Sequence, residues 1–254
     1  MKRAEPVVWG SLGAAVALLA WQLGTAGSPV IPTPWRVLVG FGELYRKGLL
    51  ASYIAASLTR VAAGYGAAAL LGLPLGALLG SYPGARQYVD TSIQLLRPIS
   101  PLAWMPLAVV WFGVGNAAPV FLIFVGAFFP ILLWTADGVR NVPKPLVAAG
   151  RNFCQSPAAV VFRVLLPAAF PRILAGLRAA LGIAWVVVVA AEMIAVDSGL
   201  GYLIIDSRNA GQRYDLVIAG MLLIGGIGIL LDSGLARAGR LKSLSWGSGY
   251  DGIH

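Results

Sequence analysis

Two oppositely charged residues, Arg60 and Glu192, lie within otherwise apolar segments of the chain. A charged group at the centre of a membrane-spanning helix costs about 2.5–3.5 kcal/mol on insertion scales, and less near the interface. Glu192 must therefore lie near water, be protonated or be paired, and Arg60 is the partner we expect. Alternatively, a single buried acid could relay protons, and the guanidinium of Arg60 could attract an anion.

A proline-rich segment, residues 95–113, is a second place where the sequence suggests a site. Pro98, Pro101 and Pro106 cannot all lie within one regular helix, because proline lacks the backbone N–H. Broken helices inside a membrane are tolerated where protein or water satisfies the freed backbone groups, and they often mark the route of a solute. A kinked helix packed in a bundle is the alternative. The candidate pathway residues are Arg60, Arg97, Pro101, Trp104, Pro106, Trp185 and Glu192.

Arg60 and Arg97 are the cationic candidates near this break, and a positive pathway would suit an anion. Packing or topology roles for both arginines are the alternative interpretation, because basic residues also set the orientation of membrane helices.

Residues 144–167 form a polar stretch between two long apolar segments. Prolines lie near both of its ends, and its valines keep a rough helical spacing. These features predict two short helices joined at Ser156-Pro157 and lying outside the bilayer. A structured polar loop between two spanning helices usually meets another protein.

The composition is that of an integral membrane protein. Hydrophobic residues make up 58% of the 254 residues and charged residues 11%, whereas soluble domains carry about 25% charged residues. The mean hydropathy is +0.80. The net charge of +9 does not indicate a nucleic-acid partner, because the basic residues lie mostly in short loops between apolar runs. That distribution is the topology signal of a multispanning chain in a lipid bilayer.

No catalytic or metal-binding constellation is present in the sequence. His254 is the only histidine, so a metal cluster or a histidine-based triad is not expected. A phosphate-binding G-x-x-x-x-G-K-[ST] motif is missing, so the chain itself should bind no nucleotide. We therefore expect a chain that is not an enzyme and binds no cofactor.

The apolar runs predict six spans, each close to the roughly 20 residues that cross a bilayer. Basic residues near both termini and in the 82–97 and 137–172 loops predict that both ends are cytoplasmic, although segment 27–60 is also basic. The predicted spans are residues 6–26, 55–81, 95–113, 120–135, 173–195 and 216–235.

These spans give a division into three parts. Residues 1–54 should hold the first span and a short amphipathic surface helix that starts at Thr33-Pro34. Residues 55–236 should form a core of five spans that contains the polar loop 143–167. Residues 237–254 should be a cytoplasmic tail.

The second predicted span carries small residues four positions apart, which allow helix backbones to approach closely in lipid. We therefore expect it to pack tightly in a bundle through Ala56, Gly64, Ala68, Gly72, Gly76 and Gly80.

The polar stretch resembles the cytoplasmic coupling loop of ABC importer permeases. The family motif runs Glu-Ala-Ala, three residues, Gly, nine residues, Ile, one residue, Leu-Pro. In this frame Ala148 replaces the Glu and Cys154 replaces the Gly, while Leu166-Pro167 keeps the end of the motif. The resemblance implies docking on an ATPase subunit through Val147, Ala148, Ala149, Gly150, Arg151, Asn152, Phe153, Cys154, Ser156, Leu166 and Pro167.

The flanking sequence is similar to permease subunits of nitrate, bicarbonate, sulfonate and taurine importers. The similarity covers residues 57–235 and is densest at 166–204, where Gly182-Ile183-Ala184-Trp185 and Ala191-Glu192-Met193 match. The proline-rich segment 95–113 is similar to the third core helix of these permeases.

The resemblance implies an all-α membrane protein with the type I ABC importer permease fold, in a multi-pass bacterial inner membrane location. Two permease chains, expected to be a homodimer, would form a pathway for a small oxoanion. Two partner ATPase subunits would bind ATP and Mg, and a periplasmic or lipid-anchored solute-binding protein would deliver the solute. The coupling helix, about residues 147–159, would seat in the ATPase, with Arg151 and Phe153 compensating for Ala148.

Two other classes of membrane protein, a secondary carrier and a membrane-embedded enzyme, are the alternatives. A proton- or ion-coupled secondary carrier would act without an ATPase and predicts an internal repeat, which is not evident between residues 1–127 and 128–254. A membrane-embedded enzyme predicts clustered histidines or acids, and the sequence has no such cluster.

Overall fold

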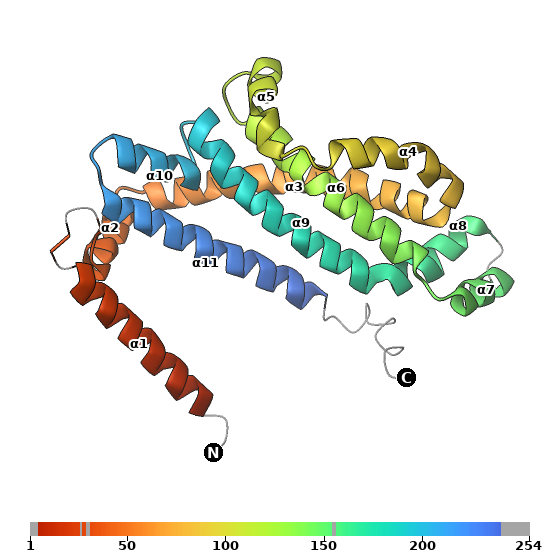
Figure 1. Ribbon diagram of the computed structural model, residues 1–254, viewed down its shortest axis with the longest axis horizontal. Coiled ribbons are helices and arrows are strands. Elements are labelled where there is room, and N and C mark those ends of the chain that lie inside the picture. The colour runs from red at the N-terminus through yellow and green to blue at the C-terminus, as the bar shows by residue number, and fades with distance from the viewer. Residues whose placement is uncertain (1–4, 26, 29–30, 154–155, 240–254) are drawn as a thin grey trace.

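Apolar runs with helical periodicity fold into an all-helical chain in the computed structural model (Figure 1), which describes residues 5–25, 27–28, 31–153 and 156–239. Two short segments differ from α-helix, a 3-10 turn at Pro101–Trp104 and a π-helical turn at Val161–Leu165. The α-helices are α1 (Glu5–Thr25), α2 (Pro34–Arg46), α3 (Leu49–Ser81), α4 (Pro83–Leu96), α5 (Met105–Phe112), α6 (Ala117–Arg140), α7 (Lys144–Phe153), α8 (Pro157–Val160), α9 (Leu166–Ala195), α10 (Leu200–Asn209) and α11 (Tyr214–Ala238).

The core consists of α3, α6 and α9 lying side by side (Figure 1). Glycines of α3 bring its backbone against α6. A Cβ built on Gly64 would lie 2.6 Å from the carbonyl oxygen of Val120, and one on Gly76 would lie 2.6 Å from that of Leu132. The predicted packing role of the small-residue stripe is therefore confirmed from Gly64 onward.

Four helices of the described chain are long and apolar enough to cross a membrane, namely α3, α6, α11 and the continuous helix Pro157–Ala195. The bent pair Tyr88–Leu96 and Pro101–Phe112 would make a fifth span. The predicted first span falls on α1, of which Ala15–Thr25 is a shorter apolar helix. The all-α membrane class is thus confirmed, and a sixth span stays a prediction.

The proline-rich segment is broken, as its three prolines predicted. The helices on either side of residues 97–100 meet at 84°. Arg97 ends α4, Pro101 opens the 3-10 turn and Pro106 lies in the first turn of α5. The alternative of one continuous, merely kinked helix is wrong for this segment.

The polar stretch differs from its prediction in its second half. The first predicted short helix is present as α7, but Ser156-Pro157 opens a single 39-residue helix that runs to Ala195. Pro167 lacks a backbone N–H and cannot donate the usual helical hydrogen bond. The π-helical turn directly before it shifts the backbone hydrogen-bond pattern, and the helix continues through the proline. The predicted second short helix is therefore the first part of the long helix, so Leu166-Pro167 does not end the loop.

The amphipathic surface helix is present as α2. Thr33 caps it by accepting a hydrogen bond from the backbone N–H of Arg36 at 3.4 Å, and Pro34 occupies its first turn. Val37 and Leu44 are buried, whereas Trp35 is 68% exposed. Figure 1 shows α1 projecting from the body beside α2, and the indole of Trp21 donates to the carbonyl of Pro32 at 3.2 Å.

The bundle has two distinct ends. We call the end that carries α10 the α10 end and the opposite end, which carries α7, the α7 end (Figure 1). The segment between the predicted spans 173–195 and 216–235 is partly helical because it contains α10.

Candidate functional site

The predicted pairing of Arg60 with Glu192 is present at the α10 end. The Nη1 atom of Arg60 donates to Oε1 of Glu192 at 2.7 Å. The side chain of Arg60 is 4% exposed and that of Glu192 is fully buried. Arg60 comes from α3 and Glu192 from α9, so the ion pair joins two core helices.

Both side chains of this pair have further partners. Oε2 of Glu192 accepts hydrogen bonds from the hydroxyl of Ser57 at 2.8 Å and from the backbone N–H of Gly201 at 3.0 Å. The guanidinium of Arg60 donates to Oδ1 of Asn116 from both Nε and Nη2, at 2.8 and 2.7 Å. It also donates to the carbonyl and the hydroxyl of Ser198, at 2.7 and 2.6 Å.

Two glycines make room for this network. Gly199 has φ of +110°, a conformation that favours glycine, and a Cβ there would collide with the carboxylate of Glu192. Gly201 lies against the backbone of Val189, and a Cβ there would collide with the Val189 carbonyl oxygen. The backbone N–H of Leu200 donates to Ser57 at 2.9 Å. The network therefore fixes the start of α10 onto α3 and α9.

The ion pair and its hydrogen bonds serve to hold helices together. A buried charge is tolerated when it is paired and its remaining hydrogen bonds are made. Arg60 and Glu192 satisfy each other, so neither is positioned to hold a solute ion. We call Ser57, Arg60, Asn116, Glu192 and Ser198 the buried ion-pair network.

A cavity of about 610 Å³ lies toward the α7 end, between the break that follows α4 and the facing parts of α6 and α9. Arg97 and Arg172 line it from different elements, together with Trp134, Asp137 and Asn141. Pro130 interrupts the hydrogen-bond ladder of α6 beside the cavity. We call this cavity the arginine cleft.

The loop residues predicted to dock a partner are carried by α7 and the turn after it. Phe153 is 88% exposed, and Arg151 is also exposed at the surface of α7. Gly150 is buried, because a Cβ there would lie 2.9 Å from Cγ2 of Val164 on the long helix. The glycine thus seats α7 against the long helix and leaves Arg151 and Phe153 outward.

The remaining residues of the predicted docking set differ in exposure. Ala148, Ala149 and Asn152 are exposed, while Val147, Leu166 and Pro167 are partly buried. Ser156 caps the long helix by accepting from the backbone N–H of Ala159 at 3.2 Å. Cys154 lies outside the described residues.

The candidate pathway residues separate into different places. Trp185 lies between helices, where its Nε1 donates to the carbonyl of Ile224 on α11 at 3.0 Å. Pro101 packs on α6, since its Cγ would lie 3.2 Å from a Cβ built on Gly126. The indole Nε1 of Trp104 is buried without a hydrogen-bond partner among the described residues. Pro106 is exposed on α5.

Residues 72–238 match the protein family described as binding-protein-dependent transport system inner membrane component. The chain belongs to this family. It is a transmembrane permease component of an ABC importer and not the ATPase.

Named relatives cover most of the permease. It is 44% identical over 207 residues to an ABC transporter permease protein of Methanocaldococcus jannaschii, covering 81% of this chain and 75% of that protein. It is 38% identical to the aliphatic sulfonates transport permease protein SsuC of Bacillus subtilis, covering 96% and 89%. It is 37% identical to the taurine transport system permease protein TauC of Escherichia coli, covering 93% and 89%.

The fold has a solved counterpart. A chain of the MetNI methionine ABC transporter, in inward-facing conformations, superposes with a TM-score of 0.66 and 21% identity, covering 76% of the permease and 94% of that chain. This likeness bears on the fold alone and confirms the expected ABC importer permease fold.

Membership of this family indicates which kinds of partner protein the permease has. A binding-protein-dependent ABC system contains an ATPase and a solute-binding protein beside this inner membrane component. ATP is handled by the partner ATPase. The described residues contain no group of three or more potential metal ligands.

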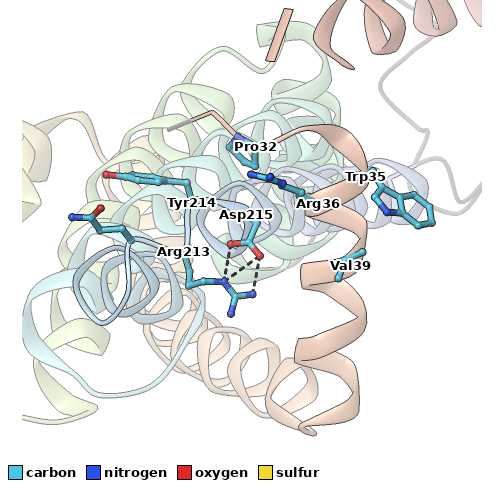
Figure 2. Close-up of a pocket in the computed structure, with 8 residues that line it drawn as sticks. Pro32, Trp35, Arg36, Val39, Arg213, Tyr214 and Asp215 are labelled. Carbon is cyan, nitrogen blue, oxygen red and sulfur yellow. Dashed lines mark hydrogen bonds and ion pairs between the residues drawn. The ribbon is translucent and has the colours of Figure 1, made fainter. Parts of the chain in front are cut away.

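A second hollow of about 460 Å³ lies at the α10 end between α2 and the start of α11. Figure 2 shows Arg213 hydrogen-bonded to Asp215 there, with Trp35 projecting away from that pair. Arg213 also donates to Glu43 at 2.6 Å. Hydrogen bonds from Arg213 and then Lys47 lower the pKa of Glu43 to about 2. This ion-pair cluster ties α2 to α11.

Sequence reasoning missed several participants in these sites. Ser57 precedes Arg60 by three positions and so shares its helix face, which is a usable signal. Asn116 and Ser198 come from turns whose approach to Arg60 depends on tertiary packing. Arg172 was expected only as a basic residue at the end of a span, and nothing in the sequence links it to Arg97.

Proposed function

We propose that this permease, as a homodimer, forms the pathway for a small oxoanion, with sulfonates as the first candidates. One observation carries the proposal. Over more than nine-tenths of its length, the permease is 38% identical to a permease named for aliphatic sulfonates and 37% identical to one named for taurine. Both names refer to compounds with a sulfonate group. Nitrate and bicarbonate, expected from the sequence, are the alternatives within the same class.

The proposed orientation places the α7 end in the cytoplasm of a bacterium and the α10 end outside. Basic residues such as Arg140, Lys144 and Arg151 gather at the α7 end, in agreement with the positive-inside rule. Both termini are then cytoplasmic. The solute-binding protein, periplasmic or lipid-anchored, delivers solute at the α10 end.

The proposed contact with the ATPase is made by α7. Arg151 and Phe153 are exposed on a helix that is fixed by Gly150, so a groove of the ATPase can receive them without a large rearrangement. The ATPase binds ATP and Mg. Its closure moves α7 and, through the Gly150–Val164 contact, the long helix that continues to Ala195. A packed element that moves as a rigid body suits a switch between two access states.

A mild-detergent pull-down of the chain from its native membrane tests this proposal. We expect an ATPase subunit with a nucleotide-binding motif to co-purify, and to be lost when Arg151→Glu and Phe153→Ala are combined. The matched control combines Arg36→Glu and Trp35→Ala, which change an exposed cation and an exposed aromatic residue on α2 at the opposite end. The control variant should retain the ATPase.

The co-purified solute-binding protein then identifies the substrate. We expect it to bind taurine or ethanesulfonate more tightly than nitrate or bicarbonate in a direct titration. A preparation that contains no ATPase and still transports after reconstitution alone would contradict the proposal and favour the proton- or ion-coupled carrier.

A further inference from the structure

The arginine cleft contains two cations that the fold leaves unpaired. Within the described ranges, neither Arg97 nor Arg172 has a hydrogen-bond or ion-pair partner, and both side chains are exposed. Three other arginines of the helix bundle and its rim are bonded to carboxylates: Arg60 to Glu192, Arg178 to Asp232 and Arg213 to Glu43 and Asp215.

Both cations lie at the ends of predicted spans, Arg97 near the start of residues 95–113 and Arg172 directly before residues 173–195. Arg97 lies at the break between α4 and the 3-10 turn, Arg172 lies within the long helix, and both line the same cavity of about 610 Å³. Ionisable residues within membrane segments are costly, and those that persist usually face a water-filled cavity and mark an ion or substrate route. Because both side chains are exposed, the cleft is a water-accessible recess lined by two arginines.

The side chains that line the arginine cleft favour an oxoanion as the ligand. A guanidinium presents a planar fork of N–H donors that matches the oxygens of a planar or tetrahedral oxoanion. The charged residues of the lining are Arg97, Arg172 and Asp137, with a formal sum of +1. The two guanidiniums suit an anion, and the partly exposed Trp134 offers an apolar surface to an organic substituent. Asn141 already uses its amide nitrogen on the carbonyl oxygen of Asp137, at 2.8 Å.

We propose that Arg97 and Arg172 together bind the transported monovalent oxoanion in this cleft during its passage through the permease. This inference rests on the proposed function and adds to it the residues that hold the solute. The two walls belong to separate elements, the break after α4 and the long helix that contacts α7. A movement of the long helix therefore changes the spacing of the two guanidiniums and releases the anion.

Uptake by the complete importer, reconstituted in proteoliposomes with its ATPase and binding protein, tests the inference. We expect Arg97→Gln and Arg172→Gln each to slow ATP-driven uptake of ethanesulfonate by about tenfold, the scale of one lost charged hydrogen bond. The control is Arg140→Gln, which removes an exposed cation from the same end of α6 but outside the cleft. Arg140→Gln should leave ATP hydrolysis and uptake unchanged, and Arg172→Lys should recover part of the uptake.

A second measurement uses the unaltered transporter and does not depend on how the variants fold. Phenylglyoxal modifies accessible arginines, and the modified sites are identified by mass spectrometry of peptides. We expect ethanesulfonate to protect Arg97 and Arg172 and to leave the modification of Arg140 unchanged.

The outcomes separate the inference from the proposed function. Uptake by the wild type with equal rates in the Arg97, Arg172 and Arg140 variants would overturn the inference and leave the proposed function intact, as would equal modification of the three arginines with and without anion. A wild-type importer that moves none of taurine, ethanesulfonate, nitrate and bicarbonate would overturn the proposed function and the inference with it.

Discussion

The two ends of the bundle treat charged residues in opposite ways. At the α10 end, Arg60 and Glu192 are buried, and each is held by several hydrogen bonds from α3, α9 and the start of α10. At the α7 end, Arg97 and Arg172 line a cavity of about 610 Å³ and have no partner within the described part of the chain. Residues of the same type thus serve packing at one end and remain available at the other.

This difference shows why the residue type alone does not identify a transport site. Arg60 was a candidate for attracting an anion because it interrupts an apolar segment. A guanidinium that already donates to a carboxylate, an amide and a serine has no donor left for a solute. Arg97 and Arg172, by contrast, have no partner within the described ranges, and they line a cavity beside the break that follows α4.

Breaking the buried ion pair should have the largest effect. Glu192→Ala leaves the Arg60 charge buried without its counter-ion, and such changes destabilise proteins by about 3–5 kcal/mol. We expect a large drop in the melting temperature of the purified permease in detergent. The comparison variant is Asp232→Ala, which breaks the exposed pair with Arg178 on the same long helix.

Asp232→Ala should leave the melting temperature unchanged within error, because exposed ion pairs contribute little. Equal melting temperatures for Glu192→Ala and the wild type would mean that the network is not a structural element. In that case Arg60 would return to the set of pathway candidates.

The contact between α3 and α6 gives a second, smaller contrast. Gly76→Ala places a methyl group 2.6 Å from the carbonyl oxygen of Leu132, and overpacking of this kind costs about 1–3 kcal/mol. Gly66 lies on the same helix, and no atom lies within 4 Å of the position that a Cβ would occupy there. We expect Gly66→Ala to be neutral or to stabilise the helix by up to about 1 kcal/mol.

Chemical denaturation of the two glycine variants, followed by circular dichroism, measures this contrast. A destabilisation of the same size in both variants would show that α3 does not approach α6 through Gly76.

Much of the fold follows from the sequence, because its causes are local. Apolar runs long enough to cross a bilayer, the proline break at 97–106 and the glycine stripe on α3 all produce the predicted elements. The ion pair between Arg60 and Glu192 was also predictable, since an isolated acid and an isolated base in apolar segments each need a counter-charge.

The remainder depends on tertiary geometry. Ser156-Pro157 resembles the start of an independent short helix, and only the continuous path through the π-helical turn shows that it begins the long helix. Likewise, Arg172 acquires its proposed role because the break after α4 brings Arg97 into the lining of the same cavity. Spacing along the sequence does not contain that information.

The cluster that joins α2 to α11 should give the smallest effect, visible as a pH dependence. Its hydrogen bonds from Arg213 and Lys47 lower the pKa of Glu43 to about 2 from its ordinary value of 4.5. A lowered pKa in the folded state means that the stabilisation is complete above pH 4.5 and is lost as the pH falls toward 2.

Thermal unfolding of the wild type and Glu43→Gln at several pH values measures this contribution. We expect the wild type to be more stable at about pH 7 by less than about 1 kcal/mol, because the side chains are partly exposed. The difference should shrink below pH 4.5. A difference that grows on acidification would contradict the assigned ion pairs.

Cysteine accessibility tests the contrast between the two ends most directly. Cys154→Ala removes the only native cysteine, and single cysteines then replace Asn141 in the arginine cleft or Ser57 in the buried ion-pair network. A membrane-impermeant maleimide is applied to inside-out and right-side-out vesicles that hold the nucleotide-free importer. We predict labelling of Asn141→Cys from the cytoplasmic side and no labelling of Ser57→Cys from either side. Labelling of Ser57→Cys, or labelling of Asn141→Cys from outside alone, would contradict a sealed α10 end and a water-accessible cleft.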